Sequence, residues 1–435
     1  MRVVQISNFP RRFGPIELLT ALVCAVSLAD FSYRWSRILG FFWDISVYQR
    51  AVSDYSTGVD PYRTDVLFPF VYHPLVLRML ALLGAVVSLK IILPVLTVGA
   101  IVWLARELAH PKTLPEGSAQ AGATASQVIT PTRFLAAVVM AGAFGGVGAA
   151  ACMSGNLAGL MHFALMAALL RASRTSGSFF RFLPYGLILL AALVKPYFLL
   201  YLAVPVMLFE RRVLALGCSV AVVALFGAIW FSFQVYWPQE YAQFLANLRW
   251  HILGRGDMGY TFFFVFGALT HHKVPMALGL HSLVSVLMIV LVPLLFKQKY
   301  GREAPFVPRL LVLYLALTLA NPRMKDYDLF PALVGFFAVF WLLSRLAAAI
   351  VLAALVLTVV PLLSSLMPEF AQQHPILFDP FGTWQIVGLA FLGVAVLMVM
   401  QEPAPGTYAP ASRPLSPAPT HDSQGEAPVT LPPPG

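Results

Sequence analysis

The residues best suited to chemistry lie between positions 42 and 74, directly after the first apolar stretch of the chain. Asp44 follows an aromatic run at 41–43, so its carboxylate is expected at a membrane boundary. A carboxylate pressed against aromatic rings tends to have a raised pKa, and such a group can take a proton from a hydroxyl. Polar groups are costly near lipid, so this position favours base chemistry at a membrane surface. The alternative is an ordinary loop acid, or a cap for an amphipathic helix over 45–53.

Lys195 is the second candidate, because it lies beside Pro196 in the middle of an apolar segment that covers 182–210. Each arm of this segment is about 14 residues long, shorter than the roughly 20 that a full crossing needs. The tip is therefore expected below the membrane surface, where an ammonium group needs an anion or a water-filled cavity. This favours a functional role for Lys195 as the ligand of an anion, and the alternative is an ion pair with an acid of the protein.

Four charged residues separate two apolar stretches between Asn321 and Asp328. Arg323 offers a planar guanidinium fork that suits phosphate. Asp326 and Asp328 suit a turn and a helix N-terminus. The alternative for the whole segment is a solvated turn with internal ion pairs.

Composition places the chain among membrane proteins. Of its 435 residues, 59% are hydrophobic and 11% are charged, and the mean hydropathy is +0.79, whereas soluble domains are about 25% charged. The net charge of +10 is interpreted as cytoplasmic orientation signals and not as a nucleic-acid surface. The three cysteines lie in apolar runs without metal-ligand spacing, so we expect inert thiols.

Apolar stretches recur along the chain and predict an all-α fold, a polytopic bundle of about 12 transmembrane helices. The spans are expected near 15–31, 87–105, 134–152, 157–170, 182–195, 197–210, 213–233, 276–296, 306–320, 328–344, 346–366 and 383–400. Residues 71–86 are expected to form an interfacial or partly re-entrant helix, because Arg78 interrupts them.

The distribution of Lys and Arg predicts the orientation of the chain. It places the N-terminal residues 1–14 in the cytoplasm and the 42–74 segment outside. The transmembrane domain is expected over 15–400. Residues 401–435 are rich in Pro, Ala, Ser and Thr, a composition that cannot bury a core, so they are predicted to be a disordered cytoplasmic tail.

Several common cofactor motifs are missing from the sequence. It contains no glycine-rich phosphate loop, Walker motif or dinucleotide fingerprint, which argues against a bound nucleotide donor. His271 and His272 have no acid or second histidine pair at ligand spacing, so neither a metal nor a cofactor is expected.

The order of these motifs resembles the polyprenol-phosphate-sugar-dependent glycosyltransferases of the C-type fold, family 87, which include mycobacterial α-mannosyltransferases. The resemblance covers about residues 40–345. The matching pieces are Asp44 with Tyr48 and Ala51, Asp60-Pro61-Tyr62, Tyr72-His73-Pro74, Gly155-Asn156, Lys195-Pro196-Tyr197, Arg211-Arg212 and the segment 321–328. His73 stands where the family has a proline, and the glutamine of the family's Gly-Gln-Asn turn is absent.

The resemblance implies an inverting hexosyltransferase, mannosyltransferase-like, in the inner membrane of a bacterium, with both chain ends in the cytoplasm and an outward-facing active-site loop after the first span. Asp44 is then the general base, and the donor phosphate is held by Lys195 and Arg323, with Lys325 or Arg255 in reserve. The sugar pocket is expected to be shaped by Tyr62, Tyr72, His73 and Asn156. The implied partners are a polyprenyl-phosphate sugar, a glycolipid or glycan acceptor and the bilayer.

Two other classes of function stay open at this point. A lipid-linked sugar flippase or small-molecule transporter also carries intramembrane charge, but it should need gating elements in both halves and tolerate loss of Asp44. A non-catalytic membrane assembly subunit is favoured if Asp44 lies far from any cavity.

Overall fold

The computed structural model describes residues 15–66, 68–110, 129–143, 147–175, 178–251, 261–270, 273–300, 306–343 and 367–373. Within these ranges the regular elements are helices and none is a strand, which confirms the all-α prediction. The N-terminal residues 1–14, the spans expected at 346–366 and 383–400, and the tail at 401–435 lie outside the described residues. One short helix at 368–373 is described between the two expected spans.

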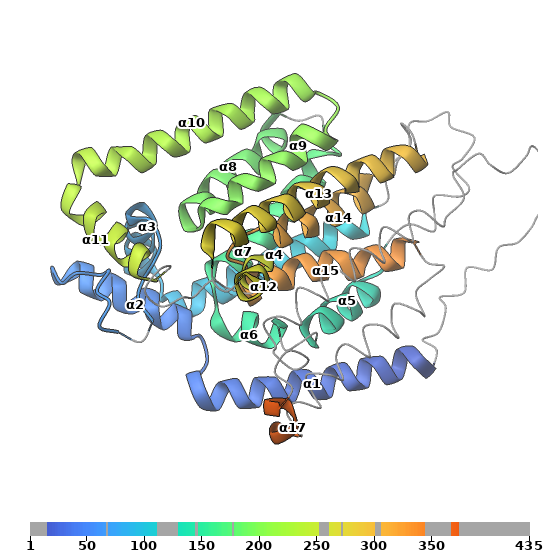
Figure 1. Cartoon of the computed structure of the whole chain (residues 1–435), viewed down its shortest axis with the longest axis horizontal. Helices are drawn as coiled ribbons and strands as arrows, with labels where there is room; N and C mark the ends of the chain where they lie inside the picture. The colour runs from blue at the N-terminus through green and yellow to red at the C-terminus, as the bar shows by residue number, and fades with distance from the viewer. Residues whose placement is uncertain are drawn as a thin grey trace, which may run out of the picture. The chain divides into compact units, whose positions relative to one another are not determined.

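Figure 1 shows the helices in their order along the chain. They are α1 (Pro15–Leu39), α2 (Trp43–Ser56), α3 (Pro74–Val86), α4 (Leu89–Ala109), α5 (Pro131–Ala143), α6 (Val147–Ser154), α7 (Leu157–Ala172), α8 (Ser178–Val194), the 3₁₀ helix η3 (Pro196–Leu202), α9 (Ala203–Leu208), α10 (Arg212–Tyr236), α11 (Pro238–Arg249), α12 (Phe262–Leu269), α13 (Val274–Tyr300), α14 (Phe306–Leu319), α15 (Asp326–Leu343) and α17 (Pro368–Gln373).

Three helices in the described part of the chain, α4, α10 and α13, are long and apolar enough to cross a membrane. They expose large apolar side chains, among them Ile91, Val220 and Leu283. Such surfaces suit contact with lipid, where a continuous helix satisfies every backbone polar group. These helices mark the chain as a membrane protein.

Apart from α1, which has 25 residues, and α15, which has 18, the remaining apolar stretches of the described residues form shorter helices. The span expected at 134–152 is divided into α5 and α6, whose axes differ by 95°, and the two together are a fourth candidate for a crossing. The shorter apolar helices are α3, α7, α8, the η3–α9 pair and α14. The expected total of about 12 spans therefore stays a prediction.

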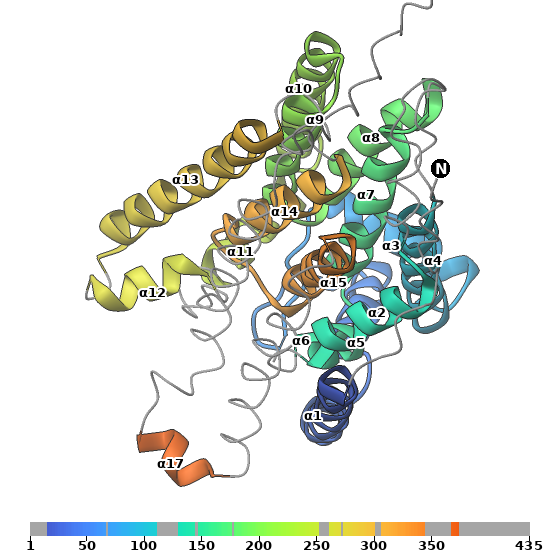
Figure 2. The same cartoon turned by 90° about the vertical axis from the view of Figure 1, so that its right-hand side faces the viewer.

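The main core lies where α14 and α15 pack against each other and against α7. Residues from Leu310 to Ala320 are buried on every side of α14, which is typical of a helix in the interior of a bundle. α15 also contacts α5 and α6, and α1 lies beside that pair (Figure 2). Helices from distant parts of the sequence thus surround α15.

A second, aromatic core joins α2 and α3 to α10 and α11. Arg78 of α3 forms an ion pair with Glu240 at 2.7 Å, and its guanidinium lies 4.2 Å from the ring centroid of Trp237. The arginine that interrupts the apolar pattern of α3 therefore anchors this helix to α11, and its charge is compensated within the protein.

The helix break expected at Lys195-Pro196 is present. α8 ends at Val194, Lys195 is extended with φ −147° and ψ 114°, and Pro196 begins η3. Proline suits the first position of a helix because it has no N–H to leave unsatisfied. The break exposes backbone polar groups among apolar helices, so its surroundings are polar.

Candidate functional site

Asp44 lies in the first turn of α2, two residues after the strained residue Phe42. Phe42 has a left-handed backbone, with φ 59° and ψ 42°, and no other non-glycine residue among those described has a positive φ. The N–H of Phe42 donates to the carbonyl of Met153 over 2.6 Å. Left-handed backbone at a bulky residue costs about 1–3 kcal/mol and persists only where the surroundings hold it. The start of α2 is therefore clamped to the end of α6.

Gly155 lets the turn between α6 and α7 approach α2 closely. Its φ is +66°, and a Cβ added there would lie 2.7 Å from Cδ1 of Ile45 and 3.3 Å from Cδ1 of Phe42. Glycine is the residue that accepts both the backbone angle and the contact. The turn at Gly155-Asn156, which the family resemblance indicated, thus brings Asn156 to the carboxylate of Asp44.

Asn156 connects the base candidate to the rest of the site. Its Nδ2 donates to Oδ2 of Asp44 over 2.9 Å. Its Oδ1 accepts from the N–H of Ala158 at 2.9 Å, which caps α7, and from the hydroxyl of Tyr72 at 3.1 Å. These two donors fix the orientation of the amide, so that only its NH₂ group faces the carboxylate.

The environment makes Asp44 a stronger base than an ordinary aspartate. Burial raises the pKa of Asp44 to about 6. Hydrogen bonds from Asn156 and Ser154 lower this pKa, although less than burial raises it. The positive charges of Lys195 and Lys325 also lower it, which places both cations within electrostatic range of the carboxylate. At neutral pH the group is mostly ionised and can accept a proton.

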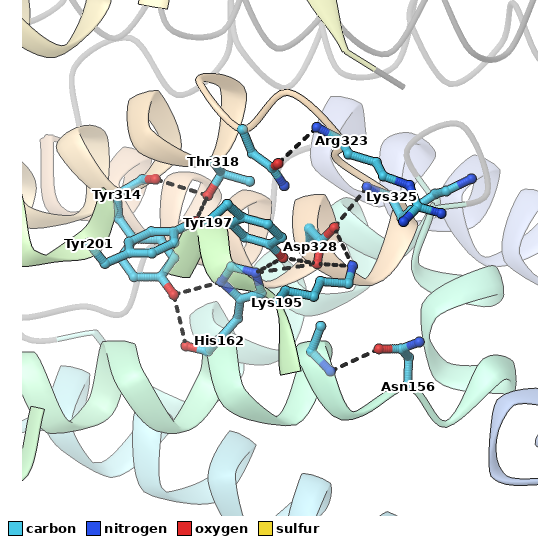
Figure 3. A network of polar contacts seen from close by, with 12 residues as sticks. Asn156, His162, Lys195, Tyr197, Tyr201, Tyr314, Thr318, Arg323, Lys325 and Asp328 are labelled. Carbon is cyan, nitrogen blue, oxygen red and sulfur yellow. Dashed lines mark hydrogen bonds and ion pairs between the residues drawn. The ribbon is translucent and has the colours of Figure 1, made fainter. Parts of the chain in front are cut away.

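Asp328 is the centre of a second polar cluster. Its carboxylate is fully buried and accepts from Nζ of Lys195, which lies 3.1 Å from Oδ1 and 3.0 Å from Oδ2. The hydroxyl of Tyr197 donates to Oδ1, and Nε2 of His162 lies 3.5 Å from the same oxygen (Figure 3). The anion that Lys195 required is therefore an acid of the protein.

Tyrosines extend this cluster into the core. Nδ1 of His162 lies 2.7 Å from the hydroxyl of Tyr314, and the hydroxyl of Tyr201 lies 2.7 Å from Oγ1 of Thr318. Thr318 in turn donates to the carbonyl of Tyr314 over 2.9 Å. The network ties together α7, η3, α14 and α15, so that the break after α8 has fixed polar surroundings (Figure 3).

Arg323 and Lys325 lie in the loop between α14 and α15. The N–H of Arg323 donates to Oδ1 of Asn321, and the N–H of Lys325 donates to Oδ2 of Asp328, both over 2.9 Å. In the view of Figure 3, both side chains lie on the same side of Asp328 as the ammonium of Lys195, opposite the tyrosines. The structure thus brings three predicted phosphate ligands to one side of the cluster.

The predicted sugar-pocket residues divide into two groups. Tyr72 and Asn156 belong to the hydrogen-bond network of Asp44. Tyr62 is buried and is connected to this network only through Tyr72, because its hydroxyl donates to the carbonyl of Tyr72 over 3.2 Å. His73 is 1% exposed among aromatic rings, and its Nδ1 accepts from the N–H of Leu75 and caps α3. Burial lowers the pKa of His73 to about 4, so the ring is neutral.

Sequence reasoning did not identify the central position of Asp328 or the participation of His162. A signal for His162 was available, since a histidine inside an apolar stretch such as 157–172 is costly unless it has polar partners. Nothing in the local pattern distinguished Asp328 from Asp326. Arg255, His271 and His272 lie outside the described residues.

Within the part of the chain that the structure describes, no group of three or more His, Cys, Asp or Glu side chains has the arrangement of a metal site. The sequence matches no protein-family model, and none of the curated proteins is significantly similar to it.

Proposed function

We propose that the chain is a membrane glycosyltransferase that transfers a mannose-like hexose from a polyprenyl-phosphate sugar to a hydroxyl of a glycolipid or glycan. The observation that carries the proposal is the carboxylate of Asp44, which is partly buried, held by Asn156 and within electrostatic range of Lys195 and Lys325. A basic carboxylate beside cations suits a reaction in which a hydroxyl loses a proton while a phosphate leaves. The resemblance to the C-type fold supports the same assignment.

In the proposed reaction, Asp44 accepts the proton of the acceptor hydroxyl. The acceptor oxygen attacks the anomeric carbon from the face opposite the phosphate, so the glycosidic bond forms with inversion. The bond from the anomeric carbon to the phosphate oxygen breaks, and its electron pair remains on the polyprenyl phosphate. Such a leaving group needs stabilisation of its negative charge more than it needs a proton. The positive charges of Arg323, Lys325 and Lys195 supply this stabilisation.

The membrane location of the donor is consistent with the apolar helices α4, α10 and α13. A polyprenyl chain is soluble in the bilayer, so its sugar reaches an enzyme whose reactive groups lie at the membrane boundary. The proposal includes about 12 spans, both chain ends in the cytoplasm and a reaction on the outer face of a bacterial inner membrane.

Transfer by the purified chain tests this function directly. The protein in lipid nanodiscs is supplied with polyprenyl-phosphate [¹⁴C]mannose and a glycolipid extract as acceptor, and label in the acceptor is measured. GDP-[¹⁴C]mannose serves as the matched donor without a lipid tail. We expect label only from the lipid-linked donor. A protein that transfers no hexose from any polyprenyl phosphate would contradict the proposal.

The ion pair between Lys195 and Asp328, with His162 beside it, favours transport of lipid-linked sugars as a second function, because buried ionic groups also occur in transport pathways. Liposomes that contain the protein and labelled donor, but no acceptor, separate the two functions. A transporter moves the donor to the other leaflet and retains this activity when Asp44 is replaced by Asn. An enzyme loses its activity with that substitution.

A further inference from the structure

We propose that Asp328 is a positioning residue for the donor phosphate. Its buried carboxylate holds the ammonium of Lys195 and the backbone N–H of Lys325, and so orients both residues. This inference rests on the proposed function and assigns a role to an acid that does not itself touch the substrate. Its support comes from the geometry on the two sides of the carboxylate.

The first support is the arrangement of Lys195. Its ammonium contacts both oxygens of Asp328, at 3.0 and 3.1 Å, and an ammonium has three N–H donors. The carboxylate is fully buried, whereas the Lys195 side chain is 15% exposed. Nζ also lies 4.1 Å from the ring centroid of Tyr327, which limits its freedom further. Lys195 thus spans from a buried anion to an accessible surface, with donor capacity left for a second acceptor.

The second support is the loop that carries Lys325. Its N–H donates to Oδ2 of Asp328 over 2.9 Å, and Asp328 is the third residue of α15. A side chain at this position that reaches back to the residue before the helix fixes how the chain enters the helix. Arg323 lies two residues earlier, and its N–H is held by Asn321. The backbone that presents both cations is therefore tied to the carboxylate that holds Lys195.

The third support is the hydrogen-bond capacity of Asp328. A carboxylate has about four acceptor sites, and this one meets Lys195, Tyr197, His162 and the N–H of Lys325. A buried group with these partners has no site left for a sugar hydroxyl. Asp328 is therefore not a second base, and it acts on a substrate only through the residues that it holds.

The structure offers a matched control for this role. Tyr197→Phe removes one hydrogen bond to Asp328 and leaves the ammonium of Lys195 and the backbone N–H of Lys325 bonded to the carboxylate. Asp328→Asn keeps one acceptor oxygen but removes the charge and the second acceptor that hold Lys195. If the network is merely structural, the two variants should have similar effects on donor binding. If Asp328 positions the cations, only the change at Asp328 should weaken binding of the donor phosphate.

The experiment uses the full chain in nanodiscs. Binding of radiolabelled polyprenyl phosphate without sugar is measured first, and then KM for polyprenyl-phosphate mannose and for the acceptor. We expect Asp328→Asn to weaken polyprenyl-phosphate binding and raise the donor KM at least tenfold, with the acceptor KM unchanged. Tyr197→Phe should stay within about twofold of the wild type in donor KM, because the ammonium of Lys195 and the N–H of Lys325 keep their contacts with the carboxylate. The loss of a hydrogen bond to a charged group should appear as a lower melting temperature.

If Asp328→Asn does not fold, as judged by size exclusion and thermal melting, Asp328→Glu takes its place. This variant keeps the charge and shifts it by one methylene, so the donor KM should again rise while the acceptor KM stays unchanged. Equal donor binding by the wild type and the Asp328 variant would overturn the inference and leave the proposed function intact. A wild-type protein that neither binds polyprenyl phosphate nor transfers from it would overturn both.

Discussion

The side-chain amide of Asn156 donates a hydrogen bond of 2.9 Å to Oδ2 of Asp44, 112 positions away in the sequence. The same residue caps α7 with its other amide atom. One asparagine therefore sets the geometry of the base candidate and also stabilises a core helix. These two tasks use different atoms, so substitutions can separate them.

Asp44→Asn is expected to lower the transfer rate by about 10²-fold or more, because the amide keeps the shape of the side chain but cannot accept a proton. The variant should melt at the same temperature or higher, since it removes a charge that burial disfavours. Asp54→Asn is the matched control, because Asp54 lies on the same helix and pairs with Arg63 at 3.2 Å. Near-normal transfer by the Asp44 variant would refute its role as the base.

The pH dependence of kcat/KM should reflect the titration of the Asp44 carboxylate. Because its pKa is raised to about 6, transfer should rise with pH through this value and level off above it. In Asn156→Asp, the new carboxylate still caps α7 but removes the hydrogen bond to Asp44 and adds a like charge. Both changes raise the pKa of Asp44, so the inflection should move to higher pH. An inflection that stays in place would exclude Asp44 as the titrating group.

Gly155→Ala should disturb the start of α2 and the position of Asp44. The added Cβ meets Ile45 at 2.7 Å on a left-handed backbone, which should cost about 1–3 kcal/mol of stability and lower transfer severalfold. Gly58→Ala separates the two causes, because Gly58 has a φ of +74° and nothing within 4 Å of an added Cβ. Thermal melting and transfer assays of both variants test this. Equal activity losses would show that the contact with Ile45 is unimportant.

Lys195→Met should destabilise the protein by about 3 kcal/mol, because it leaves the buried carboxylate of Asp328 without its cation. The double variant Lys195→Met, Asp328→Asn carries no buried charge at this pair, so it should recover most of the stability while donor use remains low. Thermal melting in detergent and the donor KM are the measurements. A double variant as unstable as Lys195→Met alone would show that the ion pair does not account for the loss.

Labelling of single cysteines tests the orientation. In a background without Cys24, Cys152 and Cys218, an impermeant maleimide on intact cells should react with a cysteine at Ser53, which is exposed on α2. It should not react with a cysteine at Ser416 until the cells are opened. The reverse pattern would place Asp44 in the cytoplasm and remove the outer-face reaction.

Much of the helical architecture was predictable because helices in an apolar chain are local features. The spans expected at 87–105, 213–233 and 276–296 correspond to α4, α10 and α13 within a few residues. The break at Lys195 was predictable as well, since the ring of a proline disfavours helical backbone at the residue before it. The division of 134–152 into α5 and α6 was not expected, because its composition is that of one continuous apolar run.

The sequence by itself determined that this chain is helical and apolar, that Asp44 follows the first apolar stretch, and that Lys195 needs an anion. Only the tertiary structure decided that Asn156 holds Asp44 and that Asp328 pairs with Lys195. Apolar periodicity and helix breaks depend on residues that are close together in the sequence. The partner of a buried charge is whichever opposite charge helix packing brings within about 4 Å, and the 133 positions between Lys195 and Asp328 leave no local trace of that contact.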